Sequence, residues 1–135
     1  MLTSYVSALI VVSTDGGGTW TRHNTPSSMY ASAYGNGIWV ATAGSASATT
    51  YTSTDNGTTW ITHLNTIPTG NWLTIKFGNG VFMAADNTGN GVAYSTDGVN
   101  WSTVSGLAAG GWRGVAYGNG VFAVSQGGSN AATIV

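Results

Sequence analysis

The sequence predicts an all-β fold, specifically a β-propeller built of four-stranded antiparallel blades. A motif that joins an aspartate to a tryptophan occurs three times in the 135 residues, with its tryptophans 40 and 41 positions apart. An Asn-Gly pair between apolar runs also occurs three times, 43 and 40 positions apart. A period of this length is the size of one propeller blade. Helix is not expected, because Glu is absent and no stretch has apolar residues at helical spacing.

Each Asn-Gly pair predicts a β-hairpin. A type I′ turn needs positive φ at both central residues, a conformation that Asn and Gly tolerate. The strand before each turn is expected to begin at an aromatic residue, namely Tyr30, Trp72 or Trp112, and an apolar strand follows the turn. A variable loop, a third strand, the aspartate motif and a fourth strand complete the repeat. The pairs are Asn36-Gly37, Asn79-Gly80 and Asn119-Gly120.

The aspartate motif predicts a tight turn between the third and fourth strands. Its carboxylate is expected to accept hydrogen bonds from backbone N–H groups of the same turn. Its tryptophan is expected to pack on the blade, which contributes ~2–3 kcal/mol of burial. The motif residues are Ser13, Asp15, Gly17 and Trp20, then Ser53, Asp55, Gly57 and Trp60, then Ser95, Asp97, Gly98 and Trp101 in a version one residue shorter. These carboxylates are therefore expected to be structural rather than catalytic.

The three motifs resemble Asp-boxes, also called BNR repeats. Such repeats are found in sialidases, in sortilin-type receptors and in many bacterial and phage propeller proteins. The combined pattern is also similar to uncharacterised propeller repeats of bacterial and phage surface proteins, and the resemblance extends along nearly the whole chain. It implies that the turns lie at the blade periphery, away from the ligand-binding face.

Composition excludes several functions. Seven residues are formally charged and the net charge is −1, which provides too few cations for nucleic-acid binding or an electrostatic membrane anchor. The longest apolar stretch, Ala8–Val12, is too short to span a bilayer and follows no basic segment of the kind that begins a signal peptide. Cys is absent, so no disulfide is possible. A surface of Thr, Ser, Asn and Gly is typical of extracellular, lectin-like and virion surface proteins.

The repeats cover residues 1–28, 29–70, 71–110 and, in part, 111–135, which amounts to one segment of about three blades. A closed propeller needs four to eight blades. We therefore expect assembly with a second copy, giving six blades, or with the rest of a longer chain. The segment from Trp112 would share a blade with the partner's N-terminal strands. Ala8–Ser13 and Ala131–Val135 both resemble third strands, and this surplus favours a truncated chain.

Catalysis is not expected, and neither is a cofactor. Sialidases use three arginines, a Tyr–Glu pair and an Asp acid, whereas this chain has Arg22 and Arg113 alone and no Glu. Glycoside hydrolysis needs two carboxylates that flank the bond, and only Asp86 lies outside the turns. His23 and His63 hold equivalent positions on different blades, so no metal site is expected.

Binding is the expected function, and neutral glycans are the expected ligand class. The loops at 21–28, 62–71 and 103–111 between blades, and at 44–50, 86–90 and 126–130 within blades, consist mostly of Ser, Thr, Asn, Gly and Gln. Arg113 and Lys76 fall in first strands, which line the channel of a propeller. Two alternatives remain open, a purely structural assembly module and a fragment of an Asp-box glycoside hydrolase. The candidate ligand residues are Arg113, Lys76, Trp72, Trp112, Asp86 and Gln126, of which the two tryptophans also fit strand packing.

Overall fold

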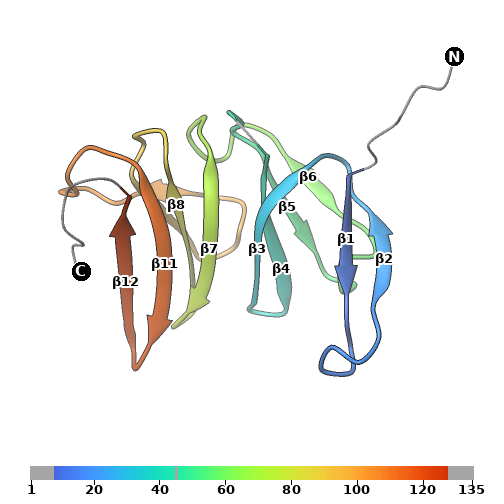
Figure 1. Ribbon diagram of the computed structural model, residues 1–135. Helices are drawn as coiled ribbons and strands as arrows, with labels where there is room; N and C mark the ends of the chain where they lie inside the picture. Colours follow the sequence, from blue (N-terminus) through green and yellow to red (C-terminus); the bar gives the residue numbers. More distant parts are fainter. Residues whose placement is uncertain (1–7, 45, 128–135) are drawn as a thin grey trace, which may run out of the picture.

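The computed structural model describes residues 8–44 and 46–127 and is all-β, with no helix in these ranges. Figure 1 shows the strands as a row of four antiparallel sheets. The all-β prediction is therefore confirmed. The strands are β1 (Leu9–Val12), β2 (Thr21–Asn24), β3 (Met29–Gly35), β4 (Ile38–Ala43), β5 (Thr50–Ser53), β6 (Ile61–His63), β7 (Trp72–Gly78), β8 (Val81–Asp86), β9 (Val92–Ser95), β10 (Ser102–Thr103), β11 (Trp112–Gly118) and β12 (Val121–Gln126).

Two of the sheets are complete meanders and two contain a single pair of strands. Sheet II has the order β3-β4-β5-β6 and sheet III the order β7-β8-β9-β10, while sheet I is β1-β2 and sheet IV is β11-β12. Sheets I and IV lie at opposite ends of the row, so the row is open (Figure 1). The third strand expected at Ala131–Val135 lies outside the described residues.

The hairpin prediction is confirmed in all three repeats. Asn36 and Gly37 have φ values of 50° and 80°, and the other two Asn-Gly pairs have the same signs. They join β3 to β4, β7 to β8 and β11 to β12. One boundary differs from the prediction, because β3 begins at Met29. Met29 opposes Ala43 as Trp72 opposes Asp86, so Met29 rather than Tyr30 is the equivalent of Trp72.

The two larger buried apolar clusters lie between successive sheets. Val40 of sheet II packs with Trp72, Ile75 and Phe82 of sheet III, and all four are buried. A second cluster joins sheet III to sheet IV and includes Val92, Trp112, Val115 and Val124. Burial of a side chain as large as Phe82 contributes ~2–3 kcal/mol. The sheets are therefore held face to face by apolar contact.

The first strands of neighbouring sheets approach closely because each ends in glycine. A Cβ atom on Gly35 of β3 would overlap the ring of Phe77 in β7, and one on Gly78 would overlap the ring of Tyr117 in β11. The aromatic residue of each first strand thus occupies space left by the glycine of the sheet before it. No described helix has the length and apolar character that crossing a membrane requires.

Candidate functional site

The two ends of the sheets carry different kinds of connection. All three Asn-Gly turns and all three aspartate-containing turns lie at one end, which we call the turn end (Figure 1). The connections from second to third strands and from one sheet to the next lie at the opposite end, which we call the loop end. Binding residues are commonly carried on loops that a rigid scaffold positions. The loop end is therefore the first place to look for a site.

The aspartates at the turn end are committed to local hydrogen bonds. Asp55 Oδ1 accepts from Thr59 N at 2.8 Å and from Ser53 Oγ at 2.8 Å, and its Oδ2 accepts from Thr59 Oγ1 at 2.6 Å. The Trp60 indole N–H donates to Gly57 O at 3.0 Å, which ties the tryptophan to the same turn. Asp15 and its neighbours make the same set of bonds in the first turn.

The third turn preserves this arrangement although it is one residue shorter. Asn100 replaces the threonine and donates to Asp97 through both its backbone N and its side-chain Nδ2, each at 2.8 Å. Ser95 Oγ donates to Asp97 Oδ1 at 2.9 Å, and Trp101 Nε1 donates to Gly98 O at 3.1 Å. We call these three structures the Asp–Trp turns. They form the tight connections between third and fourth strands.

These hydrogen bonds favour the ionised carboxylates. The Thr59 side chain and backbone lower the pKa of Asp55 from 3.8 to about 2, and Thr19 holds the pKa of Asp15 well below its usual range. Burial raises the pKa of Asp97, but the bonds from Asn100 outweigh it and the net pKa is well below the usual range. Each carboxyl is therefore an acceptor that stays ionised, the opposite of what a general acid needs.

Asp86 lies at the loop end and is also occupied. Its residue is fully buried. It accepts from the backbone N of Asn71 at 2.6 Å, Thr88 at 3.0 Å and Asn90 at 2.9 Å, and from the Thr88 hydroxyl at 2.8 Å. Burial raises the pKa of Asp86, but these bonds outweigh it, so the net shift is downward. Asp86 is therefore an internal anchor for loops rather than a group that reaches a ligand.

The loops around Asp86 are joined across sheets II and III. Ser47 and Gly70 exchange backbone hydrogen bonds of 3.1 Å in both directions. Asn71 Oδ1 accepts from Ala46 N at 2.6 Å, and Asn90 Nδ2 donates to Thr69 O at 2.8 Å. We call residues 46–48, 68–71 and 87–91 the loop platform. Because these loops are linked to one another, the platform is a preformed surface of hydroxyl, amide and backbone groups.

Gln126 is the equivalent of Asp86 in sheet IV. It opposes Trp112 in the ladder as Asp86 opposes Trp72. Gln126 Nε2 donates to Ala109 O at 2.9 Å and so holds the loop that precedes β11. The Gln126 side chain is half-buried. Its hydrogen bond to Ala109 O indicates that Gln126 anchors this loop.

The two tryptophans among the candidate ligand residues lie in the core. Trp72 is 1% exposed and Trp112 is 0% exposed. Their indole N–H groups donate to Pro68 O at 2.8 Å and to Ala108 O at 3.2 Å. Both tryptophans are therefore packing residues of the sheets, the second of the two roles that their positions allowed. The interior of a sheet stack takes large apolar side chains, and neither ring presents a face to solvent.

Three other residues occupy exposed positions at the start of the first strands. The ladder of each first strand shifts by one residue at Tyr30, Leu73 and Arg113, so each is the extra residue of a β-bulge. All three side chains are exposed, Tyr30 at 45% and Leu73 at 38%. Bulges redirect side chains away from the ladder and are common beside binding sites. We call Tyr30, Leu73 and Arg113 the bulge row.

Two members of the bulge row make the same contact in their sheets. Tyr30 lies against Gly44 and Arg113 lies against Gly127, and these two glycines directly follow the equivalent strands β4 and β12. Arg113, one of the sequence candidates, thus lies in the row, whereas Tyr30 and Leu73 were missed as ligand candidates. Lys76, the other cationic candidate, is exposed in β7 three residues after Leu73. The row begins the strands at the loop end, beside the platform (Figure 1).

The histidines do not form a metal site in the described ranges. His63 Nε2 lies 2.8 Å from the Thr52 hydroxyl on the neighbouring strand, where it fits a polar strand-end position. Residues 8–44 and 46–127 hold no group of three or more His, Asp, Glu or Cys side chains able to share an ion.

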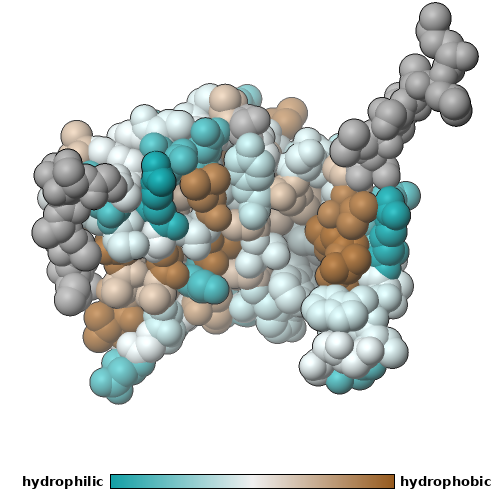
Figure 2. Space-filling view, viewed as in Figure 1, coloured by the Kyte–Doolittle hydropathy of each residue, from teal (hydrophilic) through white to brown (hydrophobic). Residues whose placement is uncertain are grey.

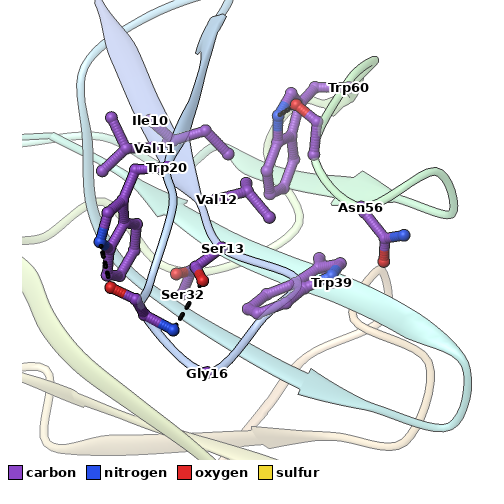
Figure 3. Close-up of a pocket in the computed structure, with 12 residues that line it drawn as sticks. Ile10, Val11, Val12, Ser13, Gly16, Trp20, Ser32, Trp39, Asn56 and Trp60 are labelled. Atoms are coloured by element: carbon purple, nitrogen blue, oxygen red, sulfur yellow. Dashed lines mark hydrogen bonds between the residues drawn. The ribbon is translucent and has the colours of Figure 1, made fainter.

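Two apolar grooves flank the incomplete sheets. The first, of about 430 Å³, lies between β1 and sheet II. Figure 3 shows the indoles of Trp20, Trp39 and Trp60 around the apolar side chains of β1. The second, of about 300 Å³, runs beside β12 and is lined by Met83, Val92, Val104, Leu107, Gly120, Val121, Phe122 and Val124.

Comparison with known proteins supports the fold alone. No family model and no curated protein matches the chain. A solved structure of a computationally designed protein, Ika8, matches with a TM-score of 0.58 at 15% sequence identity. The match covers 81% of this chain and 35% of the designed chain, so this chain spans about a third of that protein's length.

Proposed function

We propose that this chain is a non-enzymatic β-propeller module that binds a neutral glycan at its loop end, in an extracellular or virion-surface setting. The observation that carries the proposal is the bulge row. Three equivalent residues, Tyr30, Leu73 and Arg113, project from adjacent first strands. They begin those strands beside the loop platform, whose groups are neutral at its surface.

Three features support the propeller arrangement. The first strands β3, β7 and β11 lie next to one another. From each of them a sheet continues as a simple meander, complete in sheets II and III. The same glycine-to-aromatic contact recurs from sheet II to III and from III to IV. Radially repeated four-stranded meanders of this kind are propeller blades, and the resemblance of the Asp–Trp turns to Asp-boxes agrees with it.

The chemistry of the bulge row fits a sugar. An exposed tyrosine ring can stack on the apolar face of a pyranose, and its hydroxyl can hydrogen-bond. The Arg113 guanidinium offers several N–H donors in one plane, which suits vicinal hydroxyl groups. Asp86 is buried below the platform, so no carboxylate of the platform repels or competes for a neutral ligand.

The carboxylates support binding without hydrolysis. A glycosidase needs a pair of carboxyl groups, one of which must be protonated near neutral pH. In this chain all four aspartates are held by hydrogen bonds in turns or loops, and each pKa is lowered. That direction disfavours a general acid.

The proposal is tested by a glycan array followed by titration calorimetry with the best ligand. Loss of a stacked ring removes ~0.5–1.5 kcal/mol, so Tyr30→Ala should weaken binding roughly 2- to 12-fold. Arg113→Ala should weaken it as well. Tyr94→Ala is the matched control, because Tyr94 is an equally exposed tyrosine on β9, away from the bulge row. It should bind like the unmodified chain.

Three results would count against the proposal or the site that it names. A chain that binds no glycan on the array at high concentration would favour the purely structural module. Release of sugar from an array ligand or a fluorogenic glycoside would favour the glycoside hydrolase fragment. Equal loss of binding in Tyr30→Ala and Tyr94→Ala would move the site away from the bulge row.

A further inference from the structure

We propose that the edge of β12, which no strand within residues 8–44 and 46–127 pairs with, binds β1 of a second copy of this chain. Strands β11 and β12 of one molecule and β1 and β2 of the other then form one four-stranded antiparallel sheet. The proposal rests on the propeller arrangement of the proposed function, and it adds the partner, the strand register and the residues that make the contact.

The two incomplete sheets are complementary halves of one repeat. Sheet IV consists of a bulged first strand, an Asn-Gly turn and a second strand, as in β3-β4 and β7-β8. Sheet I consists of a third strand, an Asp–Trp turn and a fourth strand, as in β5-β6 and β9-β10. Among the described residues, each lacks what the other has. In the complete sheets the second strand always pairs with the third.

The complete sheets also fix the register of this pairing. Trp39 opposes Ser53 in sheet II, and Phe82 opposes Ser95 in sheet III. Each serine begins an Asp–Trp turn, and the equivalent residues of the open edges are Ser13 and Phe122. The register therefore places Phe122 opposite Ser13, Ala123 opposite Val12 and Val124 opposite Val11 of the second copy.

An unfilled glycine position marks the same junction. The terminal glycines of β3 and β7 are each covered by the aromatic ring of the next first strand. Gly118, the equivalent glycine of β11, has no described atom within 4 Å of where a Cβ would lie. Tyr34, the equivalent aromatic residue of β3, is 53% exposed, since no first strand precedes it in the described chain. Tyr34 of the second copy is the ring that fits against Gly118.

The ring of Tyr34 already packs as its two equivalents do. Phe77 and Tyr117 each pack on an aromatic residue of their own second strand, with ring centroids 4.7 Å apart. Tyr34 packs on Trp39 in the same way, at 5.2 Å and a similar interplanar angle. The ring is thus held in the orientation that its two equivalents use to cover a glycine.

Exposed apolar side chains and the two grooves lie along the edges that would join. Val11 is 51% exposed and Trp20 is 61% exposed, whereas their equivalents Tyr51 and Trp60 are buried and half-buried. Figure 2 shows the resulting hydrophobic patch over β1. The groove beside β12 is apolar, and Val11 and Trp20 of the second copy have the size and character to occupy it. Unpaired edges with apolar faces associate readily.

The second half comes from another molecule because the two halves lie far apart in one chain. Sheets I and IV are at opposite ends of the row, with sheets II and III between them (Figure 1). The contact is therefore head-to-tail, and such contacts form a ring when the rotation closes. Two copies supply four complete and two shared sheets, within the four to eight blades of closed propellers.

The register is tested by disulfide trapping in a chain that has no natural cysteine. Directly opposed residues of an antiparallel pair lie within disulfide distance. A mixture of Ala123→Cys and Val12→Cys chains should form a covalent heterodimer under oxidation. A mixture of Ala123→Cys and Val11→Cys is the matched control, because neighbouring residues of a strand point to opposite faces. Crosslinking of the control at the same yield would overturn the register.

The contact is tested separately by Gly118→Ala, with the mass measured by light scattering. The unmodified chain should have about twice the 13.7 kDa of one copy. The methyl group added by Gly118→Ala meets no described atom of its own chain, but it would overlap Tyr34 of the second copy. The mass should therefore fall toward that of one copy at micromolar concentration. Tyr34→Ala should dissociate the copies too, whereas Tyr30→Ala, in the same strand but outside the junction, should not.

The outcomes separate this proposal from the proposed function. A single-copy mass for the unmodified chain, or an unchanged mass in Gly118→Ala, would overturn the junction even if a glycan binds. A two-copy mass that Gly118→Ala and Tyr34→Ala abolish would support the junction even if no glycan on the array binds.

Discussion

Phe77 of β7 covers Gly35 of β3, and the two residues belong to different sheets. A Cβ atom on Gly35 would overlap the Phe77 ring. Gly35→Ala should therefore destabilise the chain by ~1–3 kcal/mol, the usual cost of overpacking a core. Urea denaturation followed by tryptophan fluorescence measures this change.

The cause is checked by a second substitution. Phe77→Leu shortens the side chain that the new methyl group meets, so Gly35→Ala should cost less in the Phe77→Leu background. Additive effects in the double variant would show that Gly35 is needed for another reason.

Trp101 connects an Asp–Trp turn to the core between sheets II and III. Its indole N–H donates to Gly98 O at 3.1 Å, and its ring packs against the cluster that contains Val40 and Phe82. Trp101→Phe removes the hydrogen bond and part of the apolar contact, and should cost ~1–2 kcal/mol of unfolding free energy. Tyr94→Phe, at an exposed site of β9, should leave stability unchanged under the same denaturation measurement. If Trp101→Phe lowers the unfolding free energy no more than Tyr94→Phe does, Trp101 does not anchor the turn to the core.

Asp86 should be more important for stability than for ligand contact. Asp86→Asn replaces one carboxylate oxygen with an NH₂ group, which cannot accept. At the Oδ2 position the NH₂ group would lose the bonds from the backbone N of Thr88 and Asn90, and at the Oδ1 position it would lose the bond from Asn71 N. Loss of hydrogen bonds to a buried charged acceptor should cost ~2–3 kcal/mol, measured by thermal or urea unfolding. Amide hydrogen exchange should rise in residues 68–71 and 87–91, because these loops lose their shared anchor. Unchanged exchange there would show that the loops are held by other contacts.

The sequence predicted the local features well because they depend on residues close in the chain. The Asn-Gly hairpins follow from the φ preferences of two residues, and the Asp–Trp turns from hydrogen bonds between residues two to four positions apart. The role of Asp86 also had a local signal, since Thr88 and Asn90 follow at the spacing of a loop that closes on a carboxylate. That signal was missed because Asp86 was considered as a candidate ligand group.

The bulge row and the burial of the tryptophans could not be predicted in the same way. Whether Trp72 or Leu73 faces solvent depends on the register between β7 and β8, and a bulge shifts that register by one residue. The burial of Trp112 depends on the cluster that it forms with sheet III. Both are set by residues distant in sequence, which a pattern within one strand does not reveal.

The Asp–Trp turns make stability depend on pH in the acidic range. The pKa of Asp55 falls from 3.8 to about 2 in the folded chain, and the pKa values of Asp15 and Asp97 are also lowered. A carboxyl with a lowered folded-state pKa contributes stability that is fully present above its unfolded pKa. That contribution is lost as pH falls through the folded-state value. The midpoint of thermal unfolding should therefore be flat above about pH 5 and fall between pH 4 and pH 2.

Amide variants identify the groups responsible. Asp55→Asn removes one titrating group, so its melting temperature should be lower than that of the unmodified chain at neutral pH. The difference should shrink as pH falls toward 2, because the protonated Asp55 of the unmodified chain also loses its acceptor character. Differential scanning calorimetry measures both melting temperatures. A difference between them that stays constant from pH 7 to pH 2 would show that the hydrogen bonds of Asp55 do not depend on its charge.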